Sequence, residues 1–295
     1  MNLRALGEEE LLRKILPHLP LNRSVISGPG DDCAVVKFDR RDNLLVLKTD
    51  CIVEGIHFHP KTKAVDVGWK AMARPLSDFA AMSARPQFAL VTFIAPNETK
   101  VRWSEDVYRG LGKVARACDV AIVGGETSRT DGPVAISVSV TGVVEKNRWV
   151  SRAGGKSGDD LFVTGNLGGS LRGRHLRFTP RIEEARWLTK HFSIDAMMDL
   201  SDGLGADLPR LARASKVGFE VERNSIPRNR GCTIEQAISD GEDYELLFAI
   251  SPNESKKLQR AWRKRFPNLR LTRMGKLTGK SKRNQKLPRG YDHFA

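Results

Sequence analysis

Long apolar runs are missing from this 295-residue chain. None approaches the roughly 20 consecutive apolar residues that a membrane-spanning helix needs. The first residues, MNLRALGEEELL, have no long apolar core and reach acidic residues at once, so we do not expect them to be a signal peptide. The chain is therefore expected to work in the cytoplasm, with no membrane partner.

Cysteine is also scarce. The four cysteines, Cys33, Cys51, Cys118 and Cys232, are far apart and form no CxxC pair, and the six histidines form no HExxH motif. The usual signatures of a zinc site and of a disulfide framework are therefore excluded. Buried free thiols in a reducing compartment are the expected state of these residues.

The familiar nucleotide-binding motifs are absent too. A P-loop needs GxxxxGK[ST], but GKLTGKS at 275–281 has only three residues between its glycines, and GGKS at 154–157 has Val150 where the first glycine belongs. No GxGxxG follows an expected strand, and the signatures of protein kinases are missing. A nucleotide site in this chain must use another scaffold.

Acidic residues are outnumbered, because 35 Asp and Glu stand against 49 Lys and Arg, for a formal net charge of +14. Such a surplus suits nucleic acid, an anionic surface or small anionic substrates. Much of it lies in the last third of the chain. The signature of a nucleic-acid module is missing, and only three tyrosines exist to interleave with the basic residues. We therefore expect no nucleic-acid partner.

What is present is an ordinary globular composition, with 40% hydrophobic and 28% charged residues. At this length we expect two domains, and the interleaving of expected strands and helices predicts an α/β (α+β) class. The polar, glycine-rich segment SRAGGKSGDD favours a boundary near residue 150, with domains at 1–148 and 149–295. Strands are expected at 33–38, 44–50, 88–96, 120–126, 134–144 and 161–165, and in AMMDLSD, VGFEVE and GEDYELLFAI. Helices are expected at 8–19, 66–84, 102–117, 181–191, 203–215 and 252–265.

Two of these elements carry a more specific expectation. The strand at 120–126, VAIVGGE, is expected to be short and buried. Pro75 lies inside the helical pattern at 66–84, and it predicts a kink or a helix start close to that position.

Acidic residues recur where expected elements end in small residues. They are Asp31, Asp32, Asp50, Asp78, Glu126, Asp199, Asp202, Glu242 and Asp243. Small neighbours let a ligand approach the backbone, and carboxylate oxygens are the hard ligands that Mg²⁺ prefers. Phosphoryl transfer uses such ions to offset the charges of the two phosphate groups. Each residue alone is equally well explained as a turn residue or helix N-cap, and only the whole set favours a metal site.

A series of motifs in this order resembles the thiamine-monophosphate kinase family. The motifs are ISGPGDDCAVV, KTDCIVEGIHF, VGWKAMARPLSDFAAMSARP, VGGETSR, SRAGGKSGDDLFVTGNLGGS, MMDLSDGLGADLPRLARAS, DGEDYELLF and the terminal GYDHF. The resemblance runs from about residue 5 to the C-terminus. The wider superfamily includes aminoimidazole ribonucleotide synthetase, selenophosphate synthetase and a hydrogenase maturation protein, and TDxxVEGxHF together with GEDYELLF points to the thiamine branch.

The resemblance implies an N-terminal domain whose mixed sheet forms a barrel across a homodimer, with helices outside, and a C-terminal α/β sandwich. It also implies direct in-line transfer from ATP to thiamine monophosphate, assisted by several Mg²⁺ ions, to give thiamine diphosphate. Carried over by motif, the magnesium ligands are Asp32, Thr49, Asp50, Asp78, Glu126, Asp199 and Asp202. The nucleotide-binding residues are Tyr108, Gly125, Arg152 and Ser201, and the residues that touch the thiamine phosphate are His57, Glu242 and Tyr291.

Several positions depart from the family pattern. Glu126 stands where the family has Asp, Pro75 where it has Asn, and Lys48 where it often has Ser or Thr. An ammonium group cannot ligate magnesium, so one metal contact is lost at Lys48 or is made by backbone. Two alternatives stay open: another ATP-dependent synthetase of the superfamily, and a catalytically decayed nucleotide-binding protein. The selenophosphate branch is disfavoured because the first cysteine, Cys33, directly follows GDD.

Overall fold

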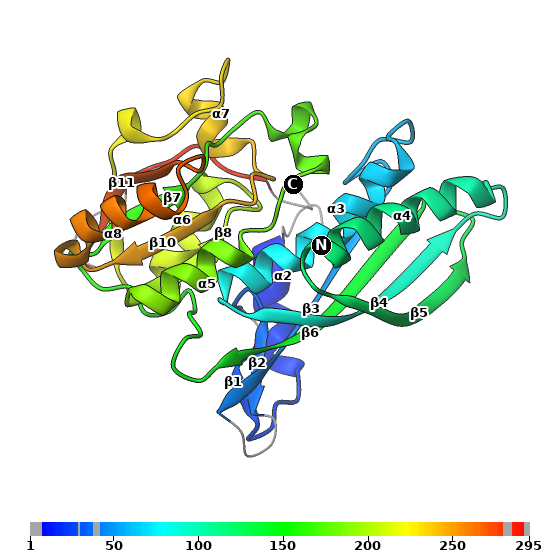
Figure 1. Cartoon of the computed structure of the whole chain (residues 1–295), viewed down its shortest axis with the longest axis horizontal. Coiled ribbons are helices and arrows are strands. Elements are labelled where there is room, and N and C mark those ends of the chain that lie inside the picture. Colours follow the sequence, from blue (N-terminus) through cyan, green and yellow to red (C-terminus); the bar gives the residue numbers. More distant parts are fainter. Residues whose placement is uncertain (1–7, 29, 38–41, 280–284, 292–295) are drawn as a thin grey trace.

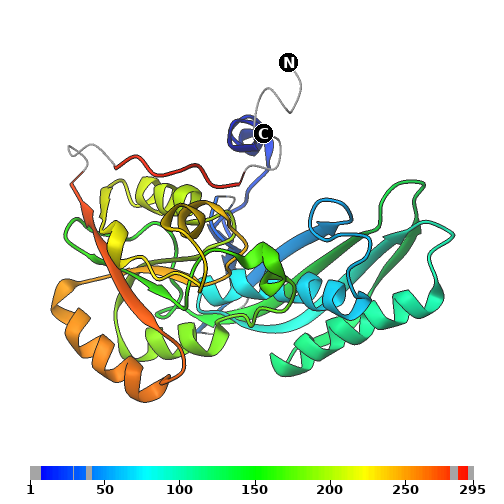
Figure 2. The ribbon, with the colours of Figure 1, turned by 90° about the horizontal axis from the view of Figure 1, so that it is seen from above.

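The computed structural model describes residues 8–28, 30–37, 42–279 and 285–291. In this part of the chain it has two β-sheets and seven α-helices, arranged as two halves that lie side by side (Figures 1 and 2). The expected mixed α/β class is thereby confirmed. Among these residues, no helix combines the length and the apolar character that crossing a membrane would require.

The first sheet has the strand order β1-β2-β3-β6-β4-β5. Its strands are β1 (Val25–Ser27), β2 (Ala34–Lys37), β3 (Asn43–Val53), β4 (Arg85–Ala95), β5 (Ala121–Arg129) and β6 (Ala135–Glu145). The strands pair antiparallel except for β4 with β5, which is parallel. Helices α3 (Ala64–Ala81) and α4 (Val101–Ala117) lie against one face of this sheet (Figure 1). Residues of β6 alternate between buried and half-buried positions, because every second side chain faces that helical layer.

No helix among the described residues covers the other face of the first sheet, and this face presents apolar side chains. Phe88, Leu90 and Val123 are 49%, 50% and 59% exposed. The sequence correctly predicted a strand at 120–126, but its expected burial was wrong, since β5 is exposed along almost its whole length. The physical reason is its position at the edge of the sheet, where no described strand of the chain pairs with its outer side.

Helix α3 is buried on nearly all sides because it packs against the first sheet, α4 and the second half of the chain. Its contact with α4 depends on two glycines. A Cβ at Gly68 would lie 1.9 Å from the Val107 carbonyl oxygen, and one at Gly110 would lie 2.1 Å from the Val65 carbonyl oxygen. The helix begins at Ala64 and continues through Pro75, so of the two expected alternatives the helix start is wrong, and a kink at Pro75 stays a prediction.

The second sheet has the order β8-β10-β7-β11-β9, and all of its described pairs are antiparallel. Its strands are β7 (Asp160–Thr164), β8 (Ile194–Asp199), β9 (Gly218–Val221), β10 (Leu246–Ile250) and β11 (Leu271–Thr278). The helices of this half are α5 (Ile182–His191), α6 (Leu204–Ala214), α7 (Ile234–Ser239) and α8 (Pro252–Arg265). Every residue of β7 and β10 is buried, because α6 and α7 contribute to one core and α5 and α8 to another.

Short elements complete the described chain. They are α2 (Glu8–Ile15) and the 3₁₀ turns Leu16–His18, Ser170–Arg172, Arg174–Leu176 and Arg223–Ser225. Near the C-terminus, the Tyr291 backbone N–H donates to the Asp202 carbonyl oxygen at 2.9 Å. The chain therefore returns to the loop that follows β8.

Candidate active site

Three carboxylates from three separate elements meet between the two halves of the chain. Asp32 precedes β2, Asp78 lies on α3 and Asp199 ends β8. One oxygen from each lies within 4.8 Å of the others, and the three residues are 2%, 8% and 3% exposed. Residues far apart in the sequence thus form one buried group, which we call the acidic cluster.

Burial and neighbouring carboxylates disfavour the ionised form of Asp78 and Asp199. Burial raises the pKa of Asp199 to about 7, with a further contribution from Asp32, although the Ser77 hydroxyl donates to Asp199 Oδ2 at 2.6 Å and opposes the rise. Burial also raises the pKa of Asp78 well above its ordinary value. Buried like charges at this separation favour either protonation or a shared cation. The donors are hard oxygens, and this donor set fits Mg²⁺.

Two cationic side chains already border the acidic cluster. Arg152 donates from Nε to Asp32 Oδ2 at 3.2 Å and from Nη2 to Asp32 Oδ1 at 2.5 Å. Lys48 Nζ lies 3.0 Å from Asp78 Oδ2 and 3.8 Å from Asp50 Oδ1. Because Lys48 and Asp50 are two residues apart on β3, both face the cluster. The structure therefore brings Asp50 and Arg152, both expected at the site, to its border.

Thr49 lies on the opposite face of β3 from its two neighbours. Its Oγ1 is 3.3 Å from Ser137 Oγ and accepts a hydrogen bond from Ser139 Oγ at 3.0 Å. Its hydroxyl therefore points to the uncovered face of the first sheet, away from the acidic cluster.

The loop after β8 contains two more of the expected residues, Ser201 and Asp202, and contacts two others, Glu242 and Tyr291. The Asp202 carboxylate pairs with Arg210 of α6, which also donates to the buried Asp207 at 2.9 Å. The Ser201 carbonyl oxygen accepts a 2.6 Å hydrogen bond from the Glu242 N–H, and Tyr291 joins the loop through its backbone. The loop therefore ties Asp202, Ser201, Glu242 and Tyr291 together, with the Asp202 carboxylate engaged by Arg210.

Two expected substrate residues are joined by a lysine. Lys70 Nζ donates to the His57 carbonyl oxygen at 2.6 Å and to Glu242 Oε2 at 2.7 Å. The Tyr244 hydroxyl donates to Glu242 Oε1 at 3.3 Å. Glu242 has a φ of 52°, a left-handed conformation that is uncommon for a residue with a side chain. His57 and Glu242, which are far apart in the sequence, thus lie near each other beside α3.

The remaining expected residues lie elsewhere within this chain. Glu126 is level with Cys51 of β3 in the pairing register, but β4 and β6 lie between the two strands. Three strand spacings separate β5 from β3 by roughly 14 Å. Gly125 is on the same strand, and Tyr108 is on α4, 39% exposed and with its ring 6.2 Å from that of Phe93. A single chain therefore does not bring these three residues to the acidic cluster.

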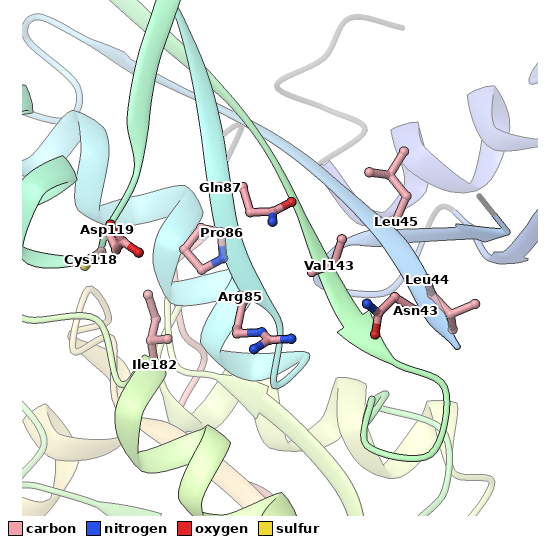
Figure 3. Close-up of a pocket in the computed structure, with 10 residues that line it drawn as sticks. All are labelled: Asn43, Leu44, Leu45, Arg85, Pro86, Gln87, Cys118, Asp119, Val143 and Ile182. Carbon is pink, nitrogen blue, oxygen red and sulfur yellow. The ribbon is translucent and has the colours of Figure 1, made fainter. Parts of the chain in front are cut away.

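A pocket of about 820 Å³ lies at the other end of the first sheet (Figure 3). Its lining residues are Asn43, Leu44, Leu45, Arg85, Pro86, Gln87, Cys118, Asp119, Val143 and Ile182. At about 3.3 Å per residue, Asn43 and Asp50 are separated by roughly 23 Å along β3. None of the expected site residues lines this pocket, so the converging charged groups, and not this pocket, define the candidate site.

Several residues of the site were not found from the sequence. Lys70, Arg74 and Asp78 recur every four residues on the largely apolar helix α3, so all three face the site. Arg74 Nη1 donates to the Cys51 carbonyl oxygen at 3.1 Å. This polar stripe was a usable signal for Lys70 and Arg74. Asp207 had no such signal, because an acidic residue in the first turn of a helix with an arginine three residues later is common in sequences.

Known families match both halves of the chain. The AIR synthase related protein N-terminal domain matches residues 30–144, and the corresponding C-terminal domain matches residues 147–283. The two-sheet fold with its acidic cluster is therefore that of an AIR synthase-related protein.

Individual relatives narrow this class. A thiamine-monophosphate kinase from Rhodopirellula baltica is 38% identical over 296 residues, covering 91% of this chain and 92% of that protein. One from Aquifex aeolicus is 33% identical and covers 100% of both. A solved structure described as AaThiL complexed with AMPPCP and TMP has a TM-score of 0.83 at 31% identity and covers 99% of each chain. The chain belongs to the thiamine-monophosphate kinase family of enzymes, which confirms the resemblance seen in its motifs.

The likeness extends to the wider class at the level of the fold. A chain of a HypE-HypF complex has a TM-score of 0.73 at 18% identity and covers 91% of this chain and 93% of that one.

Proposed function

We propose that this chain transfers the terminal phosphoryl group of ATP directly and in line to the phosphate of thiamine monophosphate, giving thiamine diphosphate, with several Mg²⁺ ions bound at the site. The observation that carries the proposal is the convergence of Asp32, Asp78 and Asp199 from both halves of the chain. The names of the relatives, and the ATP analogue and TMP in the AaThiL complex, support the same substrates.

The acidic cluster, with Asp202 in the adjoining loop, would hold the ions. Asp50 lies at the border of the cluster, beside Lys48. Bound Mg²⁺ offsets the negative charge of the phosphate groups and orients them. The acceptor phosphate is already an anion at neutral pH, so the protein needs no strong general base. Its residues contribute positioning and fixed charge.

Arg152 and Glu242 suit the two substrates. The Arg152 guanidinium has the planar fork of donors that matches phosphate oxygens, and it is placed beside Asp32. The Glu242 carboxylate offers a negative group for the positively charged thiazolium ring of thiamine. His57 lies near Glu242, because the Lys70 ammonium donates both to the His57 carbonyl oxygen and to the Glu242 carboxylate.

We also propose a homodimer in which the uncovered face of the first sheet pairs with that of a second copy to form a barrel. The exposed Phe88, Leu90 and Val123 support this arrangement. The second copy would bring its own β5, with Gly125 and Glu126, and its Tyr108 towards the acidic cluster. We further propose that the chain has two domains, at 1–148 and 149–295, and that its activity is cytoplasmic.

A direct assay tests the function. Purified protein is incubated with ATP, Mg²⁺ and thiamine monophosphate, and thiamine diphosphate is measured by chromatography. We expect product that depends on Mg²⁺, a loss of at least about 100-fold in Asp78→Asn, and full activity in Asp131→Asn, whose carboxylate is exposed and pairs with Arg129 outside the site. Folded protein that binds ATP but forms no thiamine diphosphate contradicts the proposal.

A further inference from the structure

Lys48 places a positive charge among the carboxylates of the site. Its Nζ lies 3.0 Å from Asp78 Oδ2 and 3.8 Å from Asp50 Oδ1, and its side chain is 22% exposed. A lysine ammonium is positively charged at neutral pH, and here two carboxylates lie within ion-pair distance of it. A permanent cation therefore lies between two carboxylates that the family resemblance assigns to magnesium.

The backbone fixes this position. Lys48 lies on β3 between Val46 and Asp50, all on the face that packs towards the helices, and Val46 is fully buried. β3 is a central strand, paired with β2 on one side and β6 on the other. The ammonium group thus reaches the carboxylates from a rigid element, and the stem of the side chain is largely covered.

An ammonium group and a divalent ion compete for the same oxygens. A Mg²⁺ ion bridging Asp50 and Asp78 would lie about 2.1 Å from their oxygens, next to a Lys48 ammonium that contacts the same atoms. Two cations on one oxygen repel each other. A carboxylate has two oxygens, so Asp78 can serve the ammonium with one and the acidic cluster with the other.

We propose that Lys48 is a built-in counter-cation of the site: it takes the place of a divalent ion between Asp50 and Asp78 and presents a fixed positive charge to the bound phosphate groups. The inference rests on the proposed magnesium site at Asp32, Asp78 and Asp199, and it concerns how many ions that site takes. Because the ammonium cannot dissociate from the protein, part of the charge compensation persists when Mg²⁺ is scarce.

The number of bound ions tests the inference. Mn²⁺ is titrated into the nucleotide-free protein and counted by electron paramagnetic resonance. Lys48→Met removes the charge but keeps an unbranched side chain, Lys48→Arg keeps the charge, and Lys146→Met is the control at an exposed lysine at the far end of β6. We expect Lys48→Met to bind one more ion than the wild type, and Lys48→Arg and Lys146→Met to bind the wild-type number. Equal numbers and affinities in Lys48→Met and the wild type overturn the inference.

Asp50→Asn in the wild-type background gives a test that does not require Lys48→Met to fold, and the double variant extends it. If Lys48 occupies this position, Asp50→Asn in the wild-type background leaves the number of Mn²⁺ ions unchanged, whereas in the Lys48→Met background it removes the additional ion. Loss of an ion from Asp50→Asn alone shows that Asp50 is a metal ligand and overturns the inference.

Thermal unfolding gives a readout that is independent of catalysis. With a chelator present, we expect Lys48→Met to melt below the wild type, and we expect saturating Mg²⁺ to raise its melting temperature more than that of the wild type. An equal rise in both proteins contradicts the inference. Absence of Mn²⁺ binding in every protein defeats the proposed metal site and the role of Lys48 together, whereas binding with equal stoichiometry defeats only the latter.

Discussion

The Lys70 ammonium lies 2.7 Å from the Glu242 carboxylate, across the junction of the two halves of the chain. Lys70 is completely buried on α3, and it also donates to the His57 carbonyl oxygen at 2.6 Å. Burial lowers the pKa of Lys70 to about 8, although Glu242 opposes this change. The pair thus fixes the Glu242 side chain, whose own backbone is in the left-handed region, beside the segment that carries His57.

We expect Lys70→Met to lower the free energy of unfolding by about 3 kcal/mol, because a largely covered Glu242 carboxylate would lose its partner. The same change is expected to raise the KM for thiamine monophosphate more than the KM for ATP. Urea unfolding and steady-state kinetics measure the two effects. The double variant Lys70→Met/Glu242→Gln removes the unpaired charge and is expected to recover part of the stability. An unchanged stability in Lys70→Met contradicts this role.

Gly68→Ala is expected to destabilise the fold by at least about 2 kcal/mol, because the added Cβ overlaps the backbone of α4. It would lie 1.9 Å from the Val107 carbonyl oxygen, and the two helices would have to separate. Gly112→Ala is the matched control in α4, since its Cβ would meet only the flexible end of Arg116 at 3.3 Å. We expect the control to be neutral or to gain roughly 0.5–1 kcal/mol from helix propensity. Urea unfolding of both variants checks the expectation, and equal effects would refute it.

Leu90→Asp is expected to convert a dimer into a monomer, because it places a charge in the apolar part of the uncovered sheet face. Leu90 is 50% exposed within one chain. Leu171→Asp is the control, since Leu171 is 60% exposed but lies in the second half of the chain, at Ser170–Arg172. Light scattering coupled to gel filtration gives the masses. A wild-type monomer, or a Leu90→Asp dimer as tight as the wild type, rules out the proposed barrel.

The stability of the protein is expected to depend on pH through Asp243. Burial raises the pKa of this carboxyl group to about 6, although Ser170, the Gly168 N–H and Arg174 act in the opposite direction. The folded state therefore retains the Asp243 proton where the unfolded chain has lost it, from about pH 4 to about pH 6. This contribution to stability is complete below the unfolded pKa and is lost as pH rises through about 6.

A difference of roughly two pH units between the folded and unfolded pKa corresponds to about 3 kcal/mol. We expect the wild type to lose about that much stability relative to Asp243→Asn between about pH 4 and about pH 7. Urea unfolding across this range measures the difference. The control, Asp131→Asn at an exposed position, is expected to differ from the wild type by a constant amount. A constant difference for Asp243→Asn as well would disprove the expectation.

The positions of most helices and strands were predictable from the sequence because their patterns are local. The helix expected at 252–265 is α8, and the alternation in AISVSVTGVV is the alternation of burial along β6. The exposure of β5 was not predictable, because VAIVGGE is as apolar as an internal strand. Its exposure follows from the strand order, which depends on pairings between distant segments.

The sequence predicted which residues belong to the candidate site but not how they are arranged in space. The motifs named Asp32, Asp78 and Asp199, and the structure brings them within one cluster. The motif match assigned Thr49 to the metal site together with Asp50. Strand alternation already implied that the Thr49 side chain points to the opposite face of the sheet from Asp50. The sequence did not reveal that Glu126 lies three strands from Asp50, because that separation depends on which strands pair.

Helix α3 packs against both sheets and so holds the two halves of the chain together. Asp78 is carried by this shared helix, and Asp199 is held to it by the Ser77 hydroxyl. Domain opening about a flexible hinge would have to break that packing, so the carboxylates are already assembled before any substrate binds. Substrate entry and product release would then require little reorganisation of these carboxylates.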